Sequence, residues 1–223
     1  RPALQRVRVG HGSQRQLLSL RELRIDQRLL LSLGVEPRTE RAPPTGRPFV
    51  CPKSTPTKEG SRMRRTALVT GANRGLGEAT ARGLAEGGYR VVAAVRDRDA
   101  GAALVEGLGG DDHRVLTLDQ GDPASVRAGL ARLGEDGIEV DVLVNNAGVL
   151  REGDALGAGL DTMDDSWNVN VRGPWLLIQG LVPGMRARGY GRVVNVSSGG
   201  GSFGEASMMA GHAAYAVTKA ALN

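Results

Sequence analysis

Three side chains near the end of the chain have the chemistry to give a proton to a carbonyl oxygen or to take one from an alcohol. Tyr215 and Lys219 are four residues apart, which places them on one face of a helix. A free tyrosine has a pKa of about 10, and a nearby ammonium group lowers that pKa toward neutrality. Ser198 follows an apolar run at the point where a strand would end, the place where open α/β sheets bind ligands. An exposed Tyr/Lys pair on any helix would show the same spacing.

A glycine-rich turn near residue 71 has the features of a phosphate-binding loop. It joins the apolar run 66–70 to a helix predicted over 76–87, and its backbone N–H groups would face an anion. Gly71 permits the tight turn, Gly75 lets the backbone approach a pyrophosphate, and Gly77 permits close helix–strand packing. The same turn contains Asn73, Arg74 and Leu76. An ordinary strand-to-helix loop is the alternative interpretation.

Two arginines favour NADP(H) over NAD(H) as the cofactor of such a site. Arg74 lies in the glycine turn, and Arg96 follows Val95 at the end of the second predicted strand. In a doubly wound sheet this strand end meets the adenosine ribose, where an acid suits the 2′-hydroxyl of NAD and an arginine suits the 2′-phosphate of NADP. Both arginines could instead be solvated loop cations.

Two further strand ends carry polar or small residues. Asp119 follows the third predicted strand, where its carboxylate would accept from an adenine amino group or serve as a turn residue. The fourth predicted strand ends with Asn145, Asn146, Ala147 and Gly148. Small residues there let backbone pass beneath a cofactor, and the Asn145 amide would connect neighbouring strands, although a polar turn would look the same.

The elements that must position these residues alternate between strand and helix from residue 63 onward. Asp122 and Pro123 form a helix start, and Pro174 and Pro183 are expected to kink or break a long helical region. This alternation predicts an α/β fold with a doubly wound parallel, Rossmann-like sheet. The predicted strands are 66–70, 89–95, 114–118, 140–144 and 192–196, and the helices are 76–87, 99–108, 123–133, 164–188 and one starting near 212.

The composition bounds the class of protein. Among 223 residues, 33 are glycine and only 3% are aromatic, which argues against a nucleic-acid binder that stacks bases. The single cysteine, Cys51, excludes an intrachain disulfide framework and any multi-cysteine metal site, and we expect no bound metal. No apolar stretch is long enough to span a membrane, and the chain shows no secretory leader pattern. We therefore expect a cytoplasmic protein that binds neither membrane nor nucleic acid.

Residues 1–62 differ from the remainder of the chain. They hold 13 Lys/Arg and 5 Asp/Glu together with seven of the ten prolines, whereas residues 63–223 hold 16 Lys/Arg and 19 Asp/Glu. Helical periodicity is confined to 17–33. A basic binding arm is one interpretation. We favour a disordered extension, or sequence upstream of a natural start at Met63, with the dinucleotide-binding domain at 63–223.

Taken together, these motifs resemble the classical short-chain dehydrogenase/reductase family. The family pattern is Thr-Gly-x-x-x-Gly-x-Gly, then Asn-Asn-Ala-Gly, then a serine after strand five, then Tyr-x-x-x-Lys. The chain matches it at 70–77, 145–148, Ser198 and 215–219. Similar clusters of residues occur in the carbonyl-reductase-like branch.

The resemblance implies an NADP(H)-dependent oxidoreductase acting on a small carbonyl/alcohol substrate. Tyr215 would be the general acid or base, Lys219 would lower its pKa and bind the nicotinamide ribose, and Ser198 would polarise the substrate oxygen. Asn170 would hold a water that relays protons to Lys219, with Asn168 as its rival. Ser197 and the more remote Ser202 are the alternatives to Ser198.

The resemblance also implies elements beyond Asn223. Relatives continue with the rest of the last helix, further strands and a loop that covers the substrate. We therefore expect a C-terminally incomplete domain whose far-edge strands are missing from this chain. The complete parent protein would be a homo-oligomer. An inactive or regulatory dinucleotide-binding fragment is the alternative function.

Overall fold

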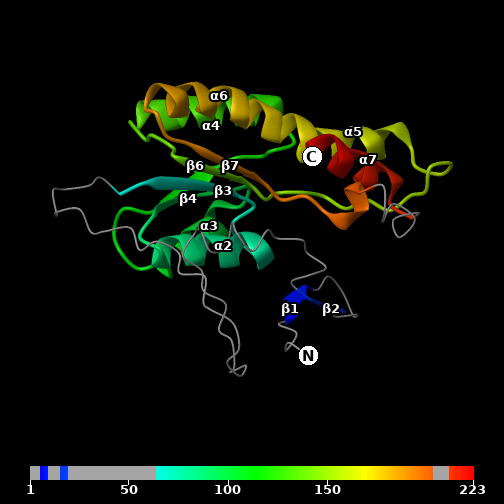
Figure 1. Cartoon of the computed structure of the whole chain (residues 1–223), viewed down its shortest axis with the longest axis horizontal. Helices are drawn as coiled ribbons and strands as arrows, with labels where there is room; N and C mark the ends of the chain where they lie inside the picture. The colour runs from blue at the N-terminus through cyan, green and yellow to red at the C-terminus, as the bar shows by residue number, and fades with distance from the viewer. Residues whose placement is uncertain (1–5, 10–15, 20–63, 203–210) are drawn as a thin grey trace, which may run out of the picture.

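A five-stranded parallel sheet forms the centre of the molecule (Figure 1). The computed structural model describes residues 6–9, 16–19, 64–202 and 211–223. The spatial order β5-β4-β3-β6-β7 is that of a doubly wound sheet, so the predicted α/β, Rossmann-like fold is confirmed. The strands are β3 (Thr66–Thr70), β4 (Arg90–Val95), β5 (Arg114–Thr117), β6 (Val142–Asn145) and β7 (Arg192–Asn195).

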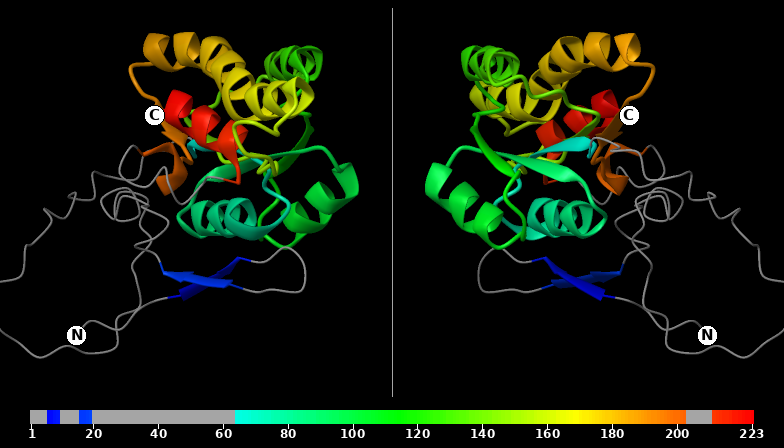
Figure 2. Two further views of the ribbon diagram at one scale, coloured as in Figure 1. Left: turned by 90° about the vertical axis from the view of Figure 1, so that its right-hand side faces the viewer. Right: turned by 90° about the vertical axis from the view of Figure 1, so that its left-hand side faces the viewer.

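Helices cover both faces of the sheet, which explains why the central strands are almost continuously apolar (Figure 2). Alternate residues of β3 face opposite sides, so Ala67 and Val69 pack in one core cluster and Leu68 in the other. The first cluster lies under α2 (Gly75–Glu86) and α3 (Arg98–Glu106), and the second under α4 (Pro123–Glu135) and α6 (Gly173–Ala187). The remaining helical elements are α5 (Leu160–Trp167), the π-helical turn η1 (Asn168–Arg172), the 3₁₀ turn η2 (Gly199–Gly201) and α7 (Ala213–Leu222).

The predicted helix boundaries differ from the structure mainly in the region before β7. The start at Asp122 and Pro123 is confirmed, because the Asp122 side chain accepts a hydrogen bond from the backbone N–H of Ala124 at 2.8 Å. The region predicted over 164–188 begins earlier, at residue 160, and contains the π-helical turn. Pro174 lies in the first turn of α6, where proline is well tolerated, whereas the break expected at Pro183 is wrong because α6 continues through it.

Part of the N-terminal extension forms strands. β1 (Arg6–Val9) pairs antiparallel with β2 (Gln16–Ser19), so the helical periodicity expected from residue 17 is wrong over 17–19. The rest of that segment, like most of residues 1–62, lies outside the described residues. Among the residues that are described, no helix is long and apolar enough to cross a membrane.

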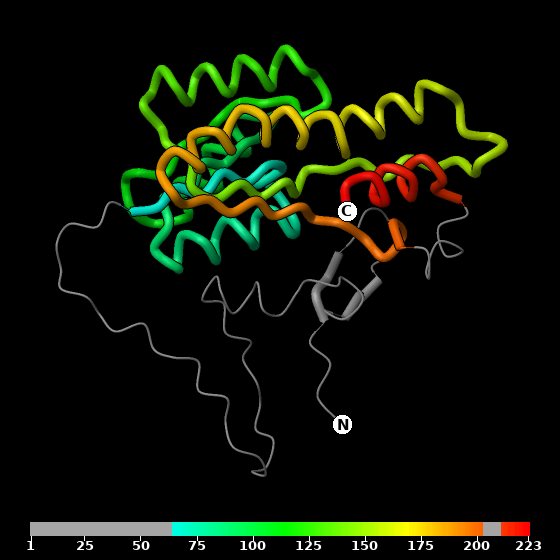
Figure 3. The backbone as a smooth tube through the Cα atoms, turned by 45° about the horizontal axis from the view of Figure 1, so that its top comes forward, coloured from blue at the N-terminus to red at the C-terminus, as the bar shows by residue number. Residues whose placement is uncertain are grey.

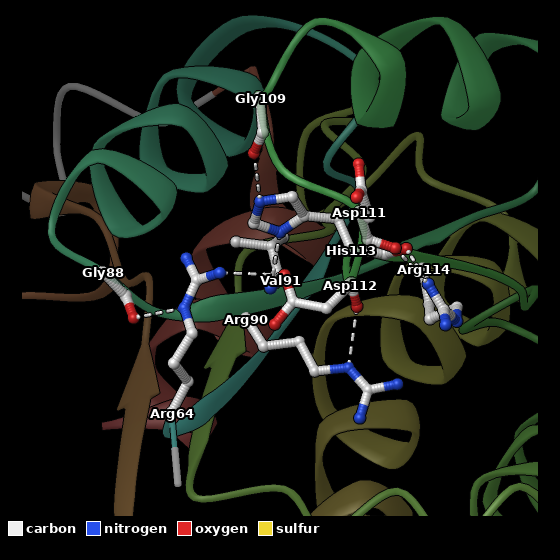
Figure 4. Close-up of polar contacts among 9 residues, drawn as sticks. All are labelled: Arg64, Gly88, Arg90, Val91, Gly109, Asp111, Asp112, His113 and Arg114. Carbon is white, nitrogen blue, oxygen red and sulfur yellow. Dashed lines mark hydrogen bonds and ion pairs between the residues drawn. The ribbon is translucent and has the colours of Figure 1, made fainter. Parts of the chain in front are cut away.

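The buried His113 connects two strands at the amino edge of the sheet (Figure 4). Its Nδ1 accepts a hydrogen bond from the backbone N–H of Val91 at 2.9 Å, and its Nε2 lies 2.9 Å from the carbonyl oxygen of Gly109. These partners require the tautomer with the proton on Nε2. Beside it, Arg90 donates to the Asp112 carbonyl at 2.8 Å, and Arg64 donates to the Gly88 carbonyl. No feature of the sequence marked His113 for this role.

The His113 contact predicts a measurable loss of stability in His113→Phe. The phenyl ring fills the space but leaves the Val91 N–H and the Gly109 carbonyl without partners. We expect the free energy of unfolding to fall by about 1–3 kcal/mol in urea denaturation. Asp111→Asn is the control, because Asp111 contributes only its backbone carbonyl to this cluster. Equal stability of the His113 variant and the control would contradict the assignment.

Candidate active site

The glycine turn between β3 and α2 has the backbone geometry that the sequence predicts. Gly71 and Gly75 have φ of +63° and +58°, a region that side chains other than glycine rarely adopt. A Cβ on Gly77 would lie 2.2 Å from the Gly71 carbonyl oxygen, so only glycine allows the helix to start this close to the strand. At Gly75 nothing lies within 4 Å of the position that a Cβ would take, which leaves the backbone accessible.

Thr70 and Asn146 join the ends of β3 and β6 beneath this turn. The Thr70 hydroxyl accepts from the backbone N–H groups of Asn146 and Ala147 at 3.1 and 3.0 Å. In return, the Asn146 side-chain amide donates to the carbonyl oxygens of Thr70 and Gly71 at 2.9 and 3.3 Å. Sequence reasoning did not single out these two residues as site residues. Their presence in the Thr-Gly and Asn-Asn-Ala-Gly motifs was the available signal.

Asn145 connects β6 to β7, as expected from the sequence. Its side-chain amide donates to the Asn195 side-chain oxygen at 2.8 Å. Next to it, Gly148 provides space where two candidate site residues meet. A Cβ there would lie 3.3 Å from Asn170 Oδ1 and 3.6 Å from Lys219 Nζ. The structure therefore brings the fourth strand's motif together with Asn170 and Lys219.

Asn170 is buried in the π-helical turn η1 and has no unused side-chain donor. Its Oδ1 accepts from the Val149 N–H at 2.8 Å, and its Nδ2 donates to the Val149 carbonyl at 3.0 Å and to Thr218 Oγ1 at 2.9 Å. Thr218 immediately precedes Lys219, so Asn170 connects the loop after β6 to α7. The rival Asn168 is only partly buried.

Ser198 precedes η2, and Tyr215 and Lys219 lie in α7. Figure 3 shows η2 and α7 side by side beyond the carboxyl end of β7. Gly201 makes this possible, since a Cβ there would lie 2.6 Å from the Lys219 backbone carbon. Ser197 bonds to the Asn223 side chain at the far end of α7, and Lys219 Nζ donates to the Val196 carbonyl at 2.7 Å. Ser198, not Ser197, is the serine whose hydroxyl acts on the pKa of the Tyr215 phenol.

Burial dominates the electrostatics of this cluster. It lowers the pKa of Lys219 to about 8 and raises the pKa of Tyr215, while a hydrogen bond with Ser198 partly offsets the rise at Tyr215. Lys219 is not among the causes of this shift, so the lowering of the Tyr215 pKa by Lys219 stays a prediction. The ammonium group lies 5.6 Å from the centre of the Tyr215 ring and donates to a carbonyl instead.

Comparisons with known proteins show the family of the chain. The family model for short chain dehydrogenase matches residues 65–223. This chain is a member of the short-chain dehydrogenase family. Oxidoreductase UcpA of Escherichia coli K12 is 39% identical over 162 residues, which are 71% of this chain and 59% of UcpA. The 3-oxoacyl-[acyl-carrier-protein] reductase FabG of Vibrio cholerae is 34% identical over 156 residues, which are 70% of this chain and 62% of FabG.

Solved short-chain dehydrogenases superpose on the same part of the chain. A short-chain dehydrogenase from Streptomyces avermitilis has a TM-score of 0.67 and 36% identity, covering 73% of this chain and 58% of that one. A gluconate 5-dehydrogenase from Burkholderia cenocepacia in complex with NADP and tartrate has a TM-score of 0.65 and 32% identity, covering 71% and 61%. The chain thus spans about three fifths of the length of the curated relatives it matches.

The remaining cofactor-binding candidates of this short-chain dehydrogenase lie in the glycine turn and after β4 and β5. Arg74 and Arg96 are exposed, and Asn73 and Leu76 are partly buried. Asp119 acts as a turn residue, since its Oδ1 accepts from the Gly121 N–H at 2.9 Å. Within the described residues, no group of three or more His, Cys, Asp or Glu side chains is arranged to hold a metal ion.

The contact at Gly77 predicts that Gly77→Ala destabilises this short-chain dehydrogenase. The new methyl group collides with the Gly71 carbonyl and the Asn146 amide, so the free energy of unfolding should fall by about 1–3 kcal/mol. Gly134→Ala is the matched control, because that helical glycine has open space around it and alanine should stabilise by up to about 1 kcal/mol. Similar values for the two variants in urea unfolding would refute the close approach.

The buried Lys219 predicts a pH-dependent stability difference between the wild type and Lys219→Met. Its pKa is about 8 in the folded state against an ordinary value of 10.5, so burying the charge costs up to about 3 kcal/mol below pH 8. Between these two pKa values the unfolded chain binds more protons, so wild-type stability rises with pH. Lys219→Met should therefore be more stable at neutral pH, with an advantage that shrinks toward pH 10.5. A difference in unfolding free energy that stays constant across this range would overturn the argument.

Proposed function

We propose that residues 63–223 form an NADP(H)-binding domain that transfers a hydride between the nicotinamide and a small carbonyl/alcohol substrate. The observation that carries this proposal is the placement of a partly buried Tyr215 whose phenol Ser198 acts on, with the ammonium group of the buried Lys219 5.6 Å from the ring centre. Proton transfer to a carbonyl oxygen requires a proton donor and groups that stabilise the developing charge. The phenol, the hydroxyl and the ammonium group supply both in one partly buried site. Their place beyond the carboxyl edge of the sheet adds support.

The residues around the glycine turn fit a dinucleotide. The open backbone at Gly75 and the start of α2 suit a pyrophosphate. Arg74 and Arg96 are exposed beside it and suit a 2′-phosphate, which is why we favour NADP(H) over NAD(H). The gluconate 5-dehydrogenase of Burkholderia cenocepacia, a structural neighbour, is in complex with NADP. Asp119 has one carboxylate oxygen left for an adenine amino group. Bound at this site, the cofactor would supply the hydride.

In carbonyl reduction Tyr215 would give its proton to the substrate oxygen while Ser198 donates a hydrogen bond to the same oxygen. The raised pKa keeps the phenol protonated at neutral pH, so Tyr215 holds the proton that reduction consumes, but it also makes the phenol a weaker acid than a free tyrosine. Lys219, still largely protonated below pH 8, would bind a ribose hydroxyl and help return a proton to Tyr215.

Asn170 would complete the proton relay through its backbone and not its side chain. The side-chain amide is occupied by Val149 and Thr218. Its main-chain carbonyl, in contrast, has no donor four residues ahead, because that residue is Pro174, and even with the π-helical donor Trp175 the oxygen can accept a second hydrogen bond. This carbonyl is the group that we propose holds the relay water.

The complete protein would act as a homo-oligomer in the cytoplasm. Large apolar side chains are exposed on neighbouring helical elements, with Trp175 63%, Val217 49% and Trp167 36% exposed. Such side chains are typical of a surface that another chain covers. Assignment to a carbonyl-reductase-like branch stays a prediction. The interpretation of residues 1–62 as a disordered or non-native extension also stays a prediction.

An inactive or regulatory dinucleotide-binding protein is the second candidate. The glycine turn favours it, because a loop that suits a pyrophosphate needs none of Ser198, Tyr215 and Lys219. Binding of NADPH without turnover of any carbonyl substrate by the wild-type chain would support this alternative.

Replacing the proposed proton donor tests the enzymatic function. Tyr215→Phe removes one hydroxyl, so turnover of a carbonyl substrate should fall by about 100-fold or more, while NADPH affinity stays unchanged. NADPH absorbance reports turnover, and cofactor fluorescence reports binding.

Tyr190→Phe is the matched control, because Tyr190 makes none of the site's contacts. Its ring centre lies 3.6 Å from the guanidinium carbon of Arg65. Turnover by Tyr215→Phe at the level of this control would refute the role given to Tyr215.

A further inference from the structure

The π-helical turn η1 leaves one of its carbonyl groups without a helical partner. In an α-helix the carbonyl of Val169 would accept from the N–H of Gly173, but that N–H donates to the carbonyl of Asn168 instead. In the π-helical pattern the donor to Val169 would be residue 174, which is a proline and has no N–H. The carbonyl next to Asn170 therefore needs a donor from elsewhere in the fold.

Gln120 supplies that donor. Its Nε2 donates to the Val169 carbonyl at 2.8 Å and to the Ala147 carbonyl at 3.0 Å. Because both partners are carbonyl oxygens, the atom facing them must be the amide nitrogen. Gln120 is only 5% exposed, and its Oε1 has no partner among the described residues. The buried Gln120 amide thus joins the loop after β6, under the proposed cofactor site, to the π-helical turn that carries Asn170.

Two glycines allow the Gln120 loop to approach the turn this closely. A Cβ on Gly173 would lie 2.3 Å from the Gln120 carbonyl oxygen, and a Cβ on Gly121 would lie 2.9 Å from Val169 Cγ2. Backbone packed against backbone leaves little freedom in the direction of the Gln120 side chain. The contact of Gln120 with the Val169 carbonyl is therefore fixed by the packing of the fold.

We propose that Gln120 is a positioning residue for the candidate active site. By satisfying the Val169 carbonyl it sets the orientation of η1, and by holding the Ala147 carbonyl it sets the distance between Asn170 and the loop ending in Gly148. Gln120 touches neither substrate nor cofactor and acts through Asn170 on the proton relay. The catalytic part of this inference rests on the function proposed above.

The test compares Gln120→Met with the wild type in the full chain. Methionine keeps the length and volume of the side chain but cannot donate. The backbone N–H of Val149 is the reporter, since it donates to Asn170 Oδ1 at 2.8 Å. Its hydrogen exchange should become about tenfold faster, relative to amides of α4, when the Val169 carbonyl loses its donor. In turnover assays with NADPH, kcat should fall about tenfold with KM for the carbonyl substrate unchanged.

Rescue and control variants separate positioning from general destabilisation. Pro174→Ala restores an N–H that can donate to Val169, so adding it to Gln120→Met should return Val149 exchange toward the wild-type rate. Gln179→Met, at an exposed position of α6, should change neither exchange nor turnover. If Gln120→Met does not fold, Gln120→Glu, which keeps the shape but presents acceptors at neutral pH, replaces it.

The exchange measurement needs no turnover, so it distinguishes failure of this inference from failure of the proposed function. Faster Val149 exchange with no turnover in any variant would support the positioning role and refute the enzymatic one. Unchanged Val149 exchange in Gln120→Met, or a rise shared by all amides and not reversed by Pro174→Ala, would overturn the inference.

Discussion

The candidate site depends on how closely two stretches of backbone approach each other at the carboxyl edge of the sheet. The side-chain amide of Asn146 donates to the carbonyls of Thr70 and Gly71, and the Thr70 hydroxyl accepts from the loop after β6. Gly77 lacks the Cβ that would collide with both the glycine turn and the Asn146 amide. If these groups moved apart, the glycine turn would lose its orientation relative to every other site residue.

The catalytic candidates are assembled around a second contact, in which α7 packs on the turn after β7. Gly201 lies against the backbone at Lys219, and Lys219 donates to the Val196 carbonyl. A charge placed in this way is costly to bury, which is why the pKa of Lys219 falls to about 8. Buried ionisable groups with shifted pKa values are typical of functional sites. Here the free-energy cost of burying the charge applies to Lys219, the residue that the proposed mechanism uses to return a proton to Tyr215.

Hydrogen bonds across the fold compensate for local irregularities of the chain. The π-helical turn η1 and Pro174 together remove the normal partners of the Val169 carbonyl, and Gln120 replaces them. At the opposite edge of the sheet, His113 gives the Val91 N–H an acceptor. Both side chains are polar and buried, a condition that is stable only when their partners are in place.

The alternation of strands and helices, the glycine turn, the start of α4 and the family could be predicted from the sequence alone, because apolar runs, glycine spacing and caps are local patterns. The sequence also brought attention to Ser198, Tyr215, Lys219 and Asn170 through their motifs. The burial that raises the pKa of Tyr215, and the continuation of α6 through Pro183, depend on how distant parts of the chain pack. The partners of Gln120 and His113 were equally hidden, since Val169 and Val91 lie 49 and 22 residues away along the chain. Such contacts arise from how the layers pack, which no local pattern encodes.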